Sequence, residues 1–351
     1  MPKYKVAIRC TSYNHAPYIE KTLEGVSSQI TNFKYIAIII DDASSDGTQN
    51  VIKQYIDDYY TTPEDGLLNY LETGDAVIYY RQHKQNKNCH IAAVLLKYNF
   101  FQIKKSKEPI ISKWINDAEY WAMCECDDYW IYERKLQEEV DFLDNNSKYG
   151  LVYTDYDIHY YDTGKYVKAA FQNGIKPTIH SFEQHLINKA YIAPMSWLCR
   201  IPLQELKDNY KGPPSIDLTF IIALELFLQS KVFYLDKVTC VYGVHKGSAT
   251  KQTSYIKQYE YAHGVYATQK YYLEKFKLRE KYPNCLDYFL NAYYVYILAR
   301  KITEEYPEVQ SFFHRKSKSS IKFLILDSLM KFKCTLPLIQ NICKMKLSKN
   351  L

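Results

Sequence analysis

Residues 35–48 read YIAIIIDDASSDGT, an apolar run that ends in two aspartates and a turn. The run from Tyr35 to Ile40 is rich in β-branched side chains, which is typical of a parallel strand covered on both faces. Residues 44–59 follow with apolar side chains at helical spacing, and residues 4–10 and 16–30 form an earlier strand and helix of the same kind. A strand, helix, strand, helix order predicts a βαβ sheet.

The rest of the chain continues this alternation. Further strands are predicted at residues 76–82, 120–126 and 231–245, further helices at 91–105, 133–146 and 216–230, and an extended segment with a turn at 150–166. From about residue 255 onward the sequence predicts basic helices. We therefore expect an α/β fold with a mixed, mainly parallel, Rossmann-like sheet flanked by helices, and a helical basic C-terminal extension. The predicted domain boundary separates residues 1–250 from residues 251–351.

Charge and composition narrow the class of protein. The 351 residues carry a net charge of +6, but residues 1–245 have 26 Lys/Arg against 31 Asp/Glu, whereas residues 246–351 have 19 against 8. A basic block of this kind favours an anionic partner, with plain solvation of helices as the alternative. Nine scattered cysteines and the lack of a long apolar run predict a cytoplasmic protein in a reducing compartment.

Polar side chains follow three of the predicted strands. They are Thr11, Tyr13 and Asn14 after the first strand, Asp41 and Asp42 after the second, and Asp127 and Asp128 after the strand at 120–126. Ligands of open parallel sheets bind at the carboxyl ends of strands, so these three groups are expected to face one site.

The stretches VAIRCTSYNHAPYIEKTLEGVSSQ, IIIDDASSDGT and CECDDYWIYERKLQEEVDFL, taken in this order and spacing, resemble the family 2 inverting glycosyltransferases with the GT-A fold. The resemblance implies a nucleotide-sugar-binding half over residues 1–145 and an acceptor and catalytic half over 146–250. It also implies that Thr11, Tyr13, Asn14, Asp41 and Asp42 hold the nucleotide. For Tyr13 and Asp41 the plainer alternatives are an ordinary tyrosine and a helix-capping acid.

Asp127 and Asp128 match the metal motif of this family. Hard divalent cations prefer carboxylate oxygen, so the resemblance implies Mn²⁺ or Mg²⁺ bridging the diphosphate of the donor, with Asp127 also contacting the nucleotide. Adjacent carboxylates repel each other and raise a pKa unless a cation offsets the charge. The alternative is a pair of solvated turn acids. Cys124 and Cys126 are interpreted as core residues, because a soft-metal site needs further ligands.

Asp217 is the candidate catalytic base. Relatives carry a catalytic aspartate at the start of an apolar helix in this part of the chain, and the alternative role is simple capping of that helix. Glu225, further along the same apolar run, is interpreted as a structural acid. An inverting transfer needs one such base, because the metal stabilises the leaving diphosphate.

Other family positions match less closely. His245 and Lys246 lie in YGVHKGSAT, which resembles a loop that approaches the diphosphate, although Gly243 replaces the usual arginine. The alternative for His245 is an ordinary turn. Trp197 is either a sugar-stacking residue or a core residue. Relatives commonly have a glycine and an Ala-Arg-Asn-type run where this chain has Asn88, Cys89 and His90.

The predicted function is transfer of a sugar from a nucleotide-diphosphate sugar, UDP-linked by preference, to a glycan or lipid-linked acceptor in bacterial polysaccharide or lipopolysaccharide synthesis. The basic, apolar tail predicts peripheral contact with the inner face of the membrane, and packing on the domain is the alternative. A non-catalytic glycan-binding or scaffolding protein is the rival function. A nucleotidyltransferase is disfavoured because IRCTSYNHAPY has no glycine, and no nucleic-acid partner is expected.

Overall fold

The computed structural model describes residues 3–63, 69–188, 192–214, 217–248 and 254–347. The described residues fall into two compact units. The first is drawn from Met1–His185, Lys189–Tyr210 and Ile221–Ser248, and the second from Leu186–Asn188, Lys211–Phe220 and Ala249–Leu351.

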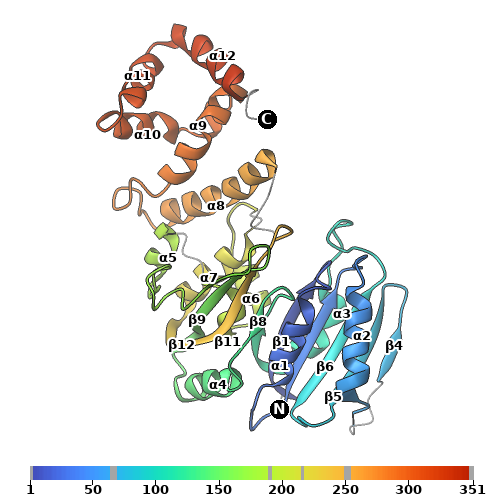
Figure 1. The fold of residues 1–351 in the computed structure, drawn as a ribbon. Coiled ribbons are helices and arrows are strands. Elements are labelled where there is room, and N and C mark those ends of the chain that lie inside the picture. The colour runs from blue at the N-terminus through green and yellow to red at the C-terminus, as the bar shows by residue number, and fades with distance from the viewer. Residues whose placement is uncertain (1–2, 64–68, 189–191, 215–216, 249–253, 348–351) are drawn as a thin grey trace. The chain divides into compact units, whose positions relative to one another are not determined.

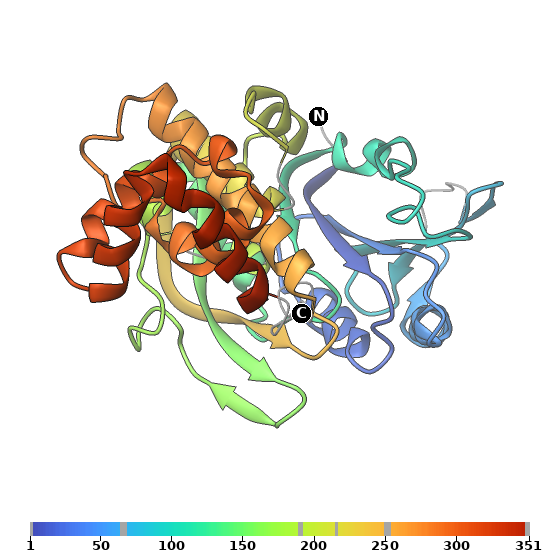
Figure 2. The same ribbon diagram turned by 90° about the horizontal axis from the view of Figure 1, so that it is seen from above.

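The first unit is built on one sheet (Figure 1). Its strands are β1 (Tyr4–Ser12), β2 (Tyr35–Asp41), β3 (Tyr60–Thr61), β4 (Tyr70–Glu72), β5 (Ala76–His83), β6 (Cys89–Leu96), β7 (Ala118–Met123), β8 (Tyr129–Trp130), β9 (Tyr149–Tyr160), β10 (Lys165–Val167), β11 (Trp197–Cys199) and β12 (Lys231–Val244). They lie in the order β3-β5-β6-β2-β1-β7-β11-β9-β12-β8, with β4 on β5. The hairpin of β9 and β10 extends as a two-stranded ribbon (Figure 2).

Strands β6, β2, β1 and β7 run parallel, while β5 and β11 join them antiparallel. The helices that precede residue 230 are α1 (Ile19–Ser27), α2 (Thr48–Tyr59), α3 (Glu108–Ile115), α4 (Lys135–Asn145), α5 (Phe182–Asn188), η1 (Pro194–Ser196), α6 (Leu203–Asn209) and α7 (Leu218–Gln229). The two units divide α5 after His185 and α7 after Phe220. The mixed, mainly parallel sheet with flanking helices confirms the predicted fold class.

Strand β2 shows why its sequence is apolar on both faces. Tyr35, Ala37 and Ile39 pack in the core that includes residues of α1, α2 and α4. The alternate residues, Ile36, Ile38 and Ile40, pack in a second core that includes residues of α3. Side chains of successive strand residues point to opposite faces, so a central strand covered on both sides needs an unbroken apolar run.

The helix predicted over residues 91–105 is wrong, because its first half is strand β6. Every residue of β6 is buried. It lies parallel to β2, with Tyr35 opposite Cys89 and Asp41 opposite Leu95, and antiparallel to β5. A short apolar run has no polar face, and its periodicity cannot separate a central strand from a buried helix.

The register brings the carboxyl ends of the parallel strands to one edge. Ser12 of β1 lies opposite Asp41 of β2. On the other side of β1, Arg9 lies opposite Met123, so the chain after β7 leaves the sheet at this same edge. The three predicted polar groups therefore share one end of the sheet.

The second unit contains the helices α8 (Tyr255–Lys275), α9 (Asp287–Arg300), α10 (Glu308–Ser317), α11 (Ile321–Met330) and α12 (Leu336–Leu347), with short turns η2 (Thr303–Glu305) and η3 (Lys333–Thr335). Its interior is aromatic: the Phe323 ring packs against Phe312 at 5.3 Å and Tyr294 at 5.6 Å between centroids. The predicted helical C-terminal region is confirmed over residues 255–347.

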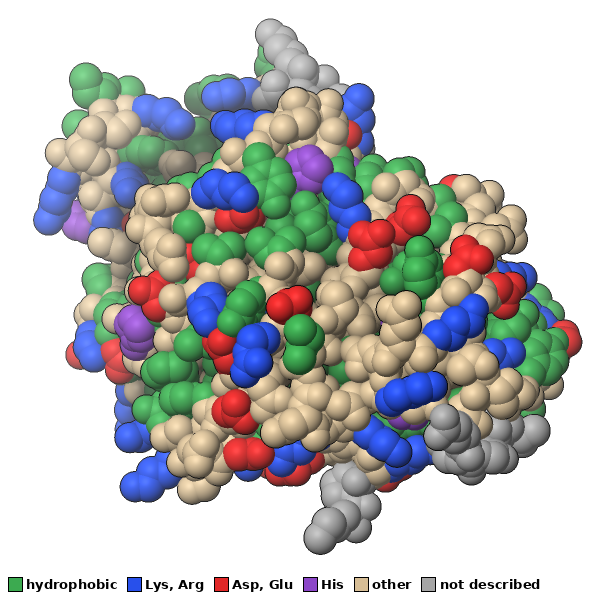
Figure 3. Space-filling view, turned by 60° about the horizontal axis from the view of Figure 1, so that its bottom comes forward, with side chains coloured by type: hydrophobic (Ala, Val, Ile, Leu, Met, Phe, Trp, Pro, Cys, Tyr) green, Lys and Arg blue, Asp and Glu red, His purple; other side chains and the backbone are tan. Residues whose placement is uncertain are grey.

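Figure 3 shows the charged side chains on one face of the molecule. Acidic and basic side chains are interspersed on the face shown in Figure 3. Among the helices of the described residues, none has the combined length and apolar content needed to cross a bilayer.

Candidate active site

Backbone hydrogen bonds hold the three polar groups together at the edge of the sheet. The Asp42 N–H donates to the Ser12 carbonyl at 2.9 Å, and the Cys126 N–H donates to the Thr11 carbonyl at 3.0 Å. The end of β1 is thus bonded on one side to the acidic turn after β2 and on the other to the segment before Asp127. The structure brings these predicted site segments into contact.

The loop after β1 is pinned to the turn that precedes α2. Asn14 has a φ of 56°, its N–H donates to Ser44 Oγ at 2.8 Å, and its Oδ1 accepts from the Ser45 N–H at 2.9 Å. The His15 N–H donates to Thr48 Oγ1 at 2.9 Å. This loop leaves Tyr13 42% exposed, so its side chain is accessible to a ligand.

Asp41 and Asp42 are both buried, and both bind their own chain. Asp41 accepts hydrogen bonds from the Ser44 N–H at 3.0 Å and from Gln49 Nε2 at 2.8 Å. Asp42 accepts from the Phe100 N–H at 2.7 Å and pairs with Lys107 Nζ at 2.9 Å. Asp41 therefore shapes the turn before α2, and Asp42 anchors the segment after β6. Neither Phe100 nor Lys107 belongs to a motif in the sequence, and Phe100 lies within the helix wrongly predicted over residues 91–105.

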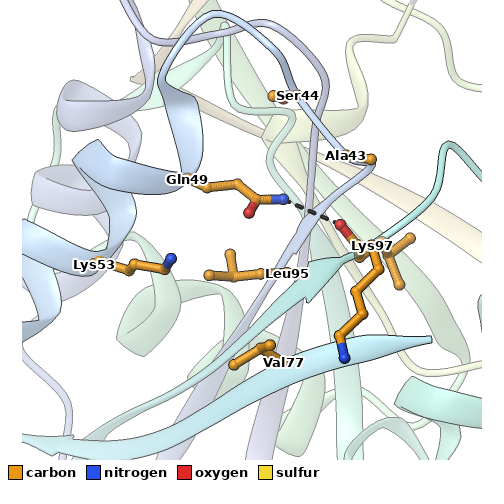
Figure 4. A pocket seen from close by; sticks show the side chains of 8 residues that line it. Ala43, Ser44, Gln49, Lys53, Val77, Leu95 and Lys97 are labelled. Atoms are coloured by element: carbon orange, nitrogen blue, oxygen red, sulfur yellow. Dashed lines mark hydrogen bonds between the residues drawn. The ribbon is translucent and has the colours of Figure 1, made fainter. Parts of the chain in front are cut away.

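A cavity of about 350 Å³ lies beside this turn (Figure 4). It is lined by Ala43, Ser44, Gln49, Lys53, Val77, Leu95, Leu96 and Lys97. Gln49 bonds both Asp41 and the Leu96 carbonyl, at 2.8 and 3.1 Å, and so forms one wall between the cavity and the acidic turn. None of the residues predicted to be functional lines this cavity.

Asp128 is a buried carboxylate next to other acids. Its side chain is 2% exposed, and its Oδ1 accepts a hydrogen bond from the Gly243 N–H at 2.7 Å. Burial, with the negative charges of Asp127 and Glu125, raises the pKa of Asp128 well above its usual value, which the Gly243 bond opposes. Burial and Asp127 also raise the pKa of Glu125 to about 7. A cation at this place would relieve both penalties.

Asp127 belongs to two groups of side chains that could hold a metal ion. Glu125, Asp127 and Asp128 form one group, and His15, Asp127 and His245 form the other; within each group the ligand atoms lie within 4.8 Å of one another. Carboxylate oxygens suit Mg²⁺ and Mn²⁺, and the mixed His and Asp set suits transition metals. The residues present therefore fit a divalent cation, with Asp127 as the common ligand.

His245 is held in a defined orientation. The Gly247 N–H donates to its Nδ1 at 3.1 Å, and the ring stacks on Tyr18 at 4.6 Å between centroids. Because a neutral imidazole has one donor and one acceptor nitrogen, its Nε2 carries the hydrogen and donates to Asp127 Oδ2 at 3.2 Å. A metal ion could bind Nε2 of His245 only if this nitrogen lost its hydrogen.

The space around Gly243 explains why this position is a glycine. A Cβ added at this position would lie 1.9 Å from the Asp127 carbonyl oxygen and 2.8 Å from the Tyr161 ring. The Gly243 backbone therefore approaches the acidic turn more closely than any side chain permits. This contact, and not the sequence pattern alone, accounts for a glycine where relatives have arginine.

We expect Gly243→Ala to displace the turn that carries Asp127 and Asp128. A clash with backbone cannot be relieved by a rotamer change, so a cost of about 1–3 kcal/mol in the free energy of unfolding is expected, together with weaker Mn²⁺ binding. Thermal unfolding with and without Mn²⁺ measures both. Gly74→Ala is the matched control, since nothing lies within 4 Å of the added Cβ. Equal unfolding temperatures for Gly243→Ala and Gly74→Ala would contradict the expectation.

Asp217 lies in the second unit, at the start of α7. Its Oδ1 accepts from the Phe220 N–H at 3.0 Å and from Thr219 Oγ1 at 2.8 Å, which is the geometry of a helix N-cap. Its Oδ2 accepts from Tyr261 Oη at 2.5 Å. The capping role weighed from the sequence is thus present, and the catalytic role stays a prediction.

The burial of the remaining residues bears on the roles that the sequence predicts for them. Trp197 is completely buried, which favours the core role over sugar stacking. Cys124 and Cys126 are likewise buried in the main core, as predicted, and Glu225 is 4% exposed. Lys246 is exposed next to buried His245. Asn88, Cys89 and His90 lie at the amino end of β6, so they are at the opposite end of the strand from Leu95, the partner of Asp41.

Residues 10–94 match the sequence model of the family described as Glycosyl transferase family 2. The match includes the loop after β1 and the acidic turn after β2. It bears out, over these residues, the family resemblance described from the sequence.

Two curated relatives are uncharacterized proteins of Mycobacterium tuberculosis and Mycobacterium bovis. Each is 28% identical to this chain over 160 residues, which is 46% of this chain. The matched part spans only 37% of the length of each relative.

Among solved structures, the crystal structure of S. aureus TarS 1-349 in complex with UDP-GlcNAc has a TM-score of 0.50 at 15% identity, covering 97% of this chain and 88% of that chain. Another crystal structure of S. aureus TarS 1-349 also has a TM-score of 0.50, at 14% identity, covering 99% of this chain and 92% of that chain. At this identity the likeness shows a shared fold, in agreement with the expected GT-A architecture.

Proposed function

We propose that this chain, whose residues 10–94 match the sequence model of Glycosyl transferase family 2, moves a sugar from a nucleotide-diphosphate sugar to a hydroxyl group with inversion at the anomeric carbon. The observation that carries the proposal is Asp127, which belongs to two candidate cation sites at the edge where the loops after β1, β2 and β7 meet. That edge is where open α/β sheets bind their ligands.

The donor is proposed to lie across this edge with its base near the loop after β1. Tyr13, which is 42% exposed, offers a stacking surface, and Thr11 and Asn14 are proposed to contact the same nucleotide. Asp41 and Asp42 act on the donor through the turn and the segment they hold in place. We infer a UDP-linked sugar as the donor class.

Asp127, with Asp128 and Glu125, would hold Mn²⁺ or Mg²⁺ beside the diphosphate. The bound cation supplies charge that stabilises the departing diphosphate. In this proposal His245 orients Asp127 by donating from Nε2 to Oδ2, and Gly243 orients Asp128 by donating from its backbone N–H. Both are positioning roles that leave carboxylate oxygen free for the ion.

In the proposed reaction Asp217 accepts the proton of the acceptor hydroxyl. The acceptor oxygen forms its bond to the anomeric carbon while the bond from that carbon to the diphosphate oxygen breaks. A positioned carboxylate base contributes about 10²–10⁴-fold in rate. The Phe220 N–H and Tyr261 Oη fix the Asp217 carboxylate, and this fixed orientation supports the assignment.

The two candidate metal groups predict different effects of substitution. We expect Asp128→Asn to weaken Mn²⁺ binding more than His245→Gln does, because hard cations prefer oxygen and because Nε2 of His245 carries a hydrogen. Asparagine keeps the oxygen that accepts from Gly243, so the fold is preserved. Isothermal titration calorimetry with Mn²⁺ and UDP measures the two affinities. A larger loss for His245→Gln would place the ion among His15, Asp127 and His245 instead.

The acceptor is proposed to be a glycan or a lipid-linked sugar in bacterial surface polysaccharide or lipopolysaccharide synthesis, and the enzyme to act in the cytoplasm, in contact with the inner face of the membrane. The basic, apolar tail supports this location.

A second candidate is a non-catalytic glycan-binding or scaffolding protein with this fold. It is favoured by one observation: the carboxylates of Asp41 and Asp42 bind their own chain. Thermal-shift screening of nucleotide diphosphates and their sugars, with and without Mn²⁺, separates the two. Metal-dependent stabilisation by UDP or a UDP-sugar is expected of the transferase, and stabilisation by none of the nucleotides would favour the scaffold.

A further inference from the structure

The end of the second unit has an unusual charge distribution. Residues 318–347 contain six lysines and a single acid, Asp327. That acid is 4% exposed, accepts from His314 Nδ1 at 3.2 Å and lies 3.6 Å from Lys331 Nζ. The segment therefore presents no acidic side chain to solvent, in contrast to the mixed surface in Figure 3.

Helix α11 is apolar on its outer face as well as its inner one. Phe323 packs inward, 5.3 Å from the Phe312 ring and 5.6 Å from the Tyr294 ring. On the opposite side, Ile321, Leu324 and Ile325 are 78%, 50% and 53% exposed. We call these three residues the α11 stripe.

Helix α12 repeats the arrangement. Ile339, Cys343 and Leu347 are buried, and α12 packs mainly on α9. Leu338, Ile342 and Met345, at positions i, i+4 and i+7, are 60%, 56% and 67% exposed and form the α12 stripe. The two stripes place six exposed apolar side chains on consecutive helices, whereas apolar residues exposed singly are the ordinary case at a protein surface.

Lysines flank both stripes. Lys318 caps the end of α10, Lys322 lies in the first turn of α11, and Lys331 follows the end of α11. Lys344 and Lys346 lie in the last turn of α12, and all five lysines are exposed. Aliphatic side chains with lysines beside them and no exposed acid form the pattern of a helix resting in a bilayer interface. A symmetric pair of chains would bring like charges together across these stripes. Nucleic acid would satisfy the lysines but would leave the aliphatic side chains without a partner.

We propose that the α11 and α12 stripes seat the second unit on an anionic lipid surface, with the aliphatic side chains in the acyl boundary and the lysines at the headgroups. This assigns the membrane contact of the proposed function to two helices of the second unit, and it does not depend on the sugar transfer.

Vesicle flotation of the full chain tests the proposal. We expect binding to vesicles of phosphatidylcholine mixed with phosphatidylglycerol, and weak binding to phosphatidylcholine alone. Each stripe replaced by serine should lower the affinity at least about tenfold, and Lys318→Gln or Lys322→Gln about fivefold each at low salt. Tyr288→Ser, at a residue that is 80% exposed outside both stripes, is the matched control and should bind like the wild type.

Two further measurements distinguish a loss of lipid binding from misfolding and from a loss of donor binding. Thermal unfolding and UDP binding of each variant should match the wild type, because the stripes lie outside the fold's core and the donor site. Loss of donor binding alone would count against the proposed transferase and not against the lipid surface. Unchanged vesicle binding in both stripe variants would overturn the proposal. The proposal would also be overturned if the wild type did not bind anionic vesicles and instead self-associated through the stripes or bound RNA.

Discussion

Asp127→Asn is expected to reduce sugar transfer more than about 100-fold, because loss of an outer-shell partner alone costs metal sites up to about this factor. Asp127 is the one side chain common to both candidate cation groups in the described residues. Asparagine keeps the size of the side chain and removes the charge that attracts the ion. Release of UDP from a UDP-sugar at saturating Mn²⁺ measures the effect.

The control for this substitution is Asp57→Asn, which removes an exposed acid of α2. This substitution removes one negative charge, as Asp127→Asn does, but at a position away from the edge of the sheet. It should retain wild-type turnover. Asp127→Asn should also unfold near the wild-type temperature in the absence of metal. Wild-type turnover by Asp127→Asn would exclude a metal-assisted reaction centred on this residue.

Asp217→Asn should lower transfer by about 10²–10⁴-fold while leaving donor binding unchanged. The substitution is selective because asparagine caps a helix N-terminus about as well as aspartate. The oxygen that accepts from the Phe220 N–H is kept, and only the basic carboxylate is lost. Single-turnover transfer and UDP affinity, measured on the same preparation, report the two properties separately.

Asp217→Ala extends the test by removing the cap as well as the base. It is expected to cost about 0.5–2 kcal/mol of stability in addition to the lost transfer. If Asp217 served only as a cap, Asp217→Asn would turn over like the wild type and only Asp217→Ala would be impaired. That outcome would refute the assignment of the base.

The parallel core of the fold could be predicted because its strands are short apolar runs that end in polar residues. Residues 4–10 and 35–42 have this pattern, and both form strands at the predicted places. Strand β6 was missed because a run buried on both faces, Cys89–Leu96, has no polar side from which to distinguish a strand from a helix. Strand β6 pairs with β2 and β5, and the residues of β6 alone do not indicate these pairings.

The candidate site was predictable as a set of segments but not as a set of contacts. The polar residues at strand ends are evident in the sequence, and the structure brings those of β1, β2 and β7 together. That Asp42 binds the Phe100 N–H, and that Gly243 lies against the Asp127 carbonyl, depends on chain crossings distant in sequence. His15 gave no signal by itself, since only the fold places it beside His245, at 5.8 Å between rings.

Titration of Mn²⁺ into the protein in the presence of UDP, followed by the loss of the free-ion signal in electron paramagnetic resonance, tests the central claim most directly. The wild type is expected to bind one ion per chain, and Asp127→Asn to bind it more than about 100-fold more weakly. Equal Mn²⁺ affinity of the two proteins, or no binding by the wild type, would contradict a cation held by Asp127 at the edge of the sheet.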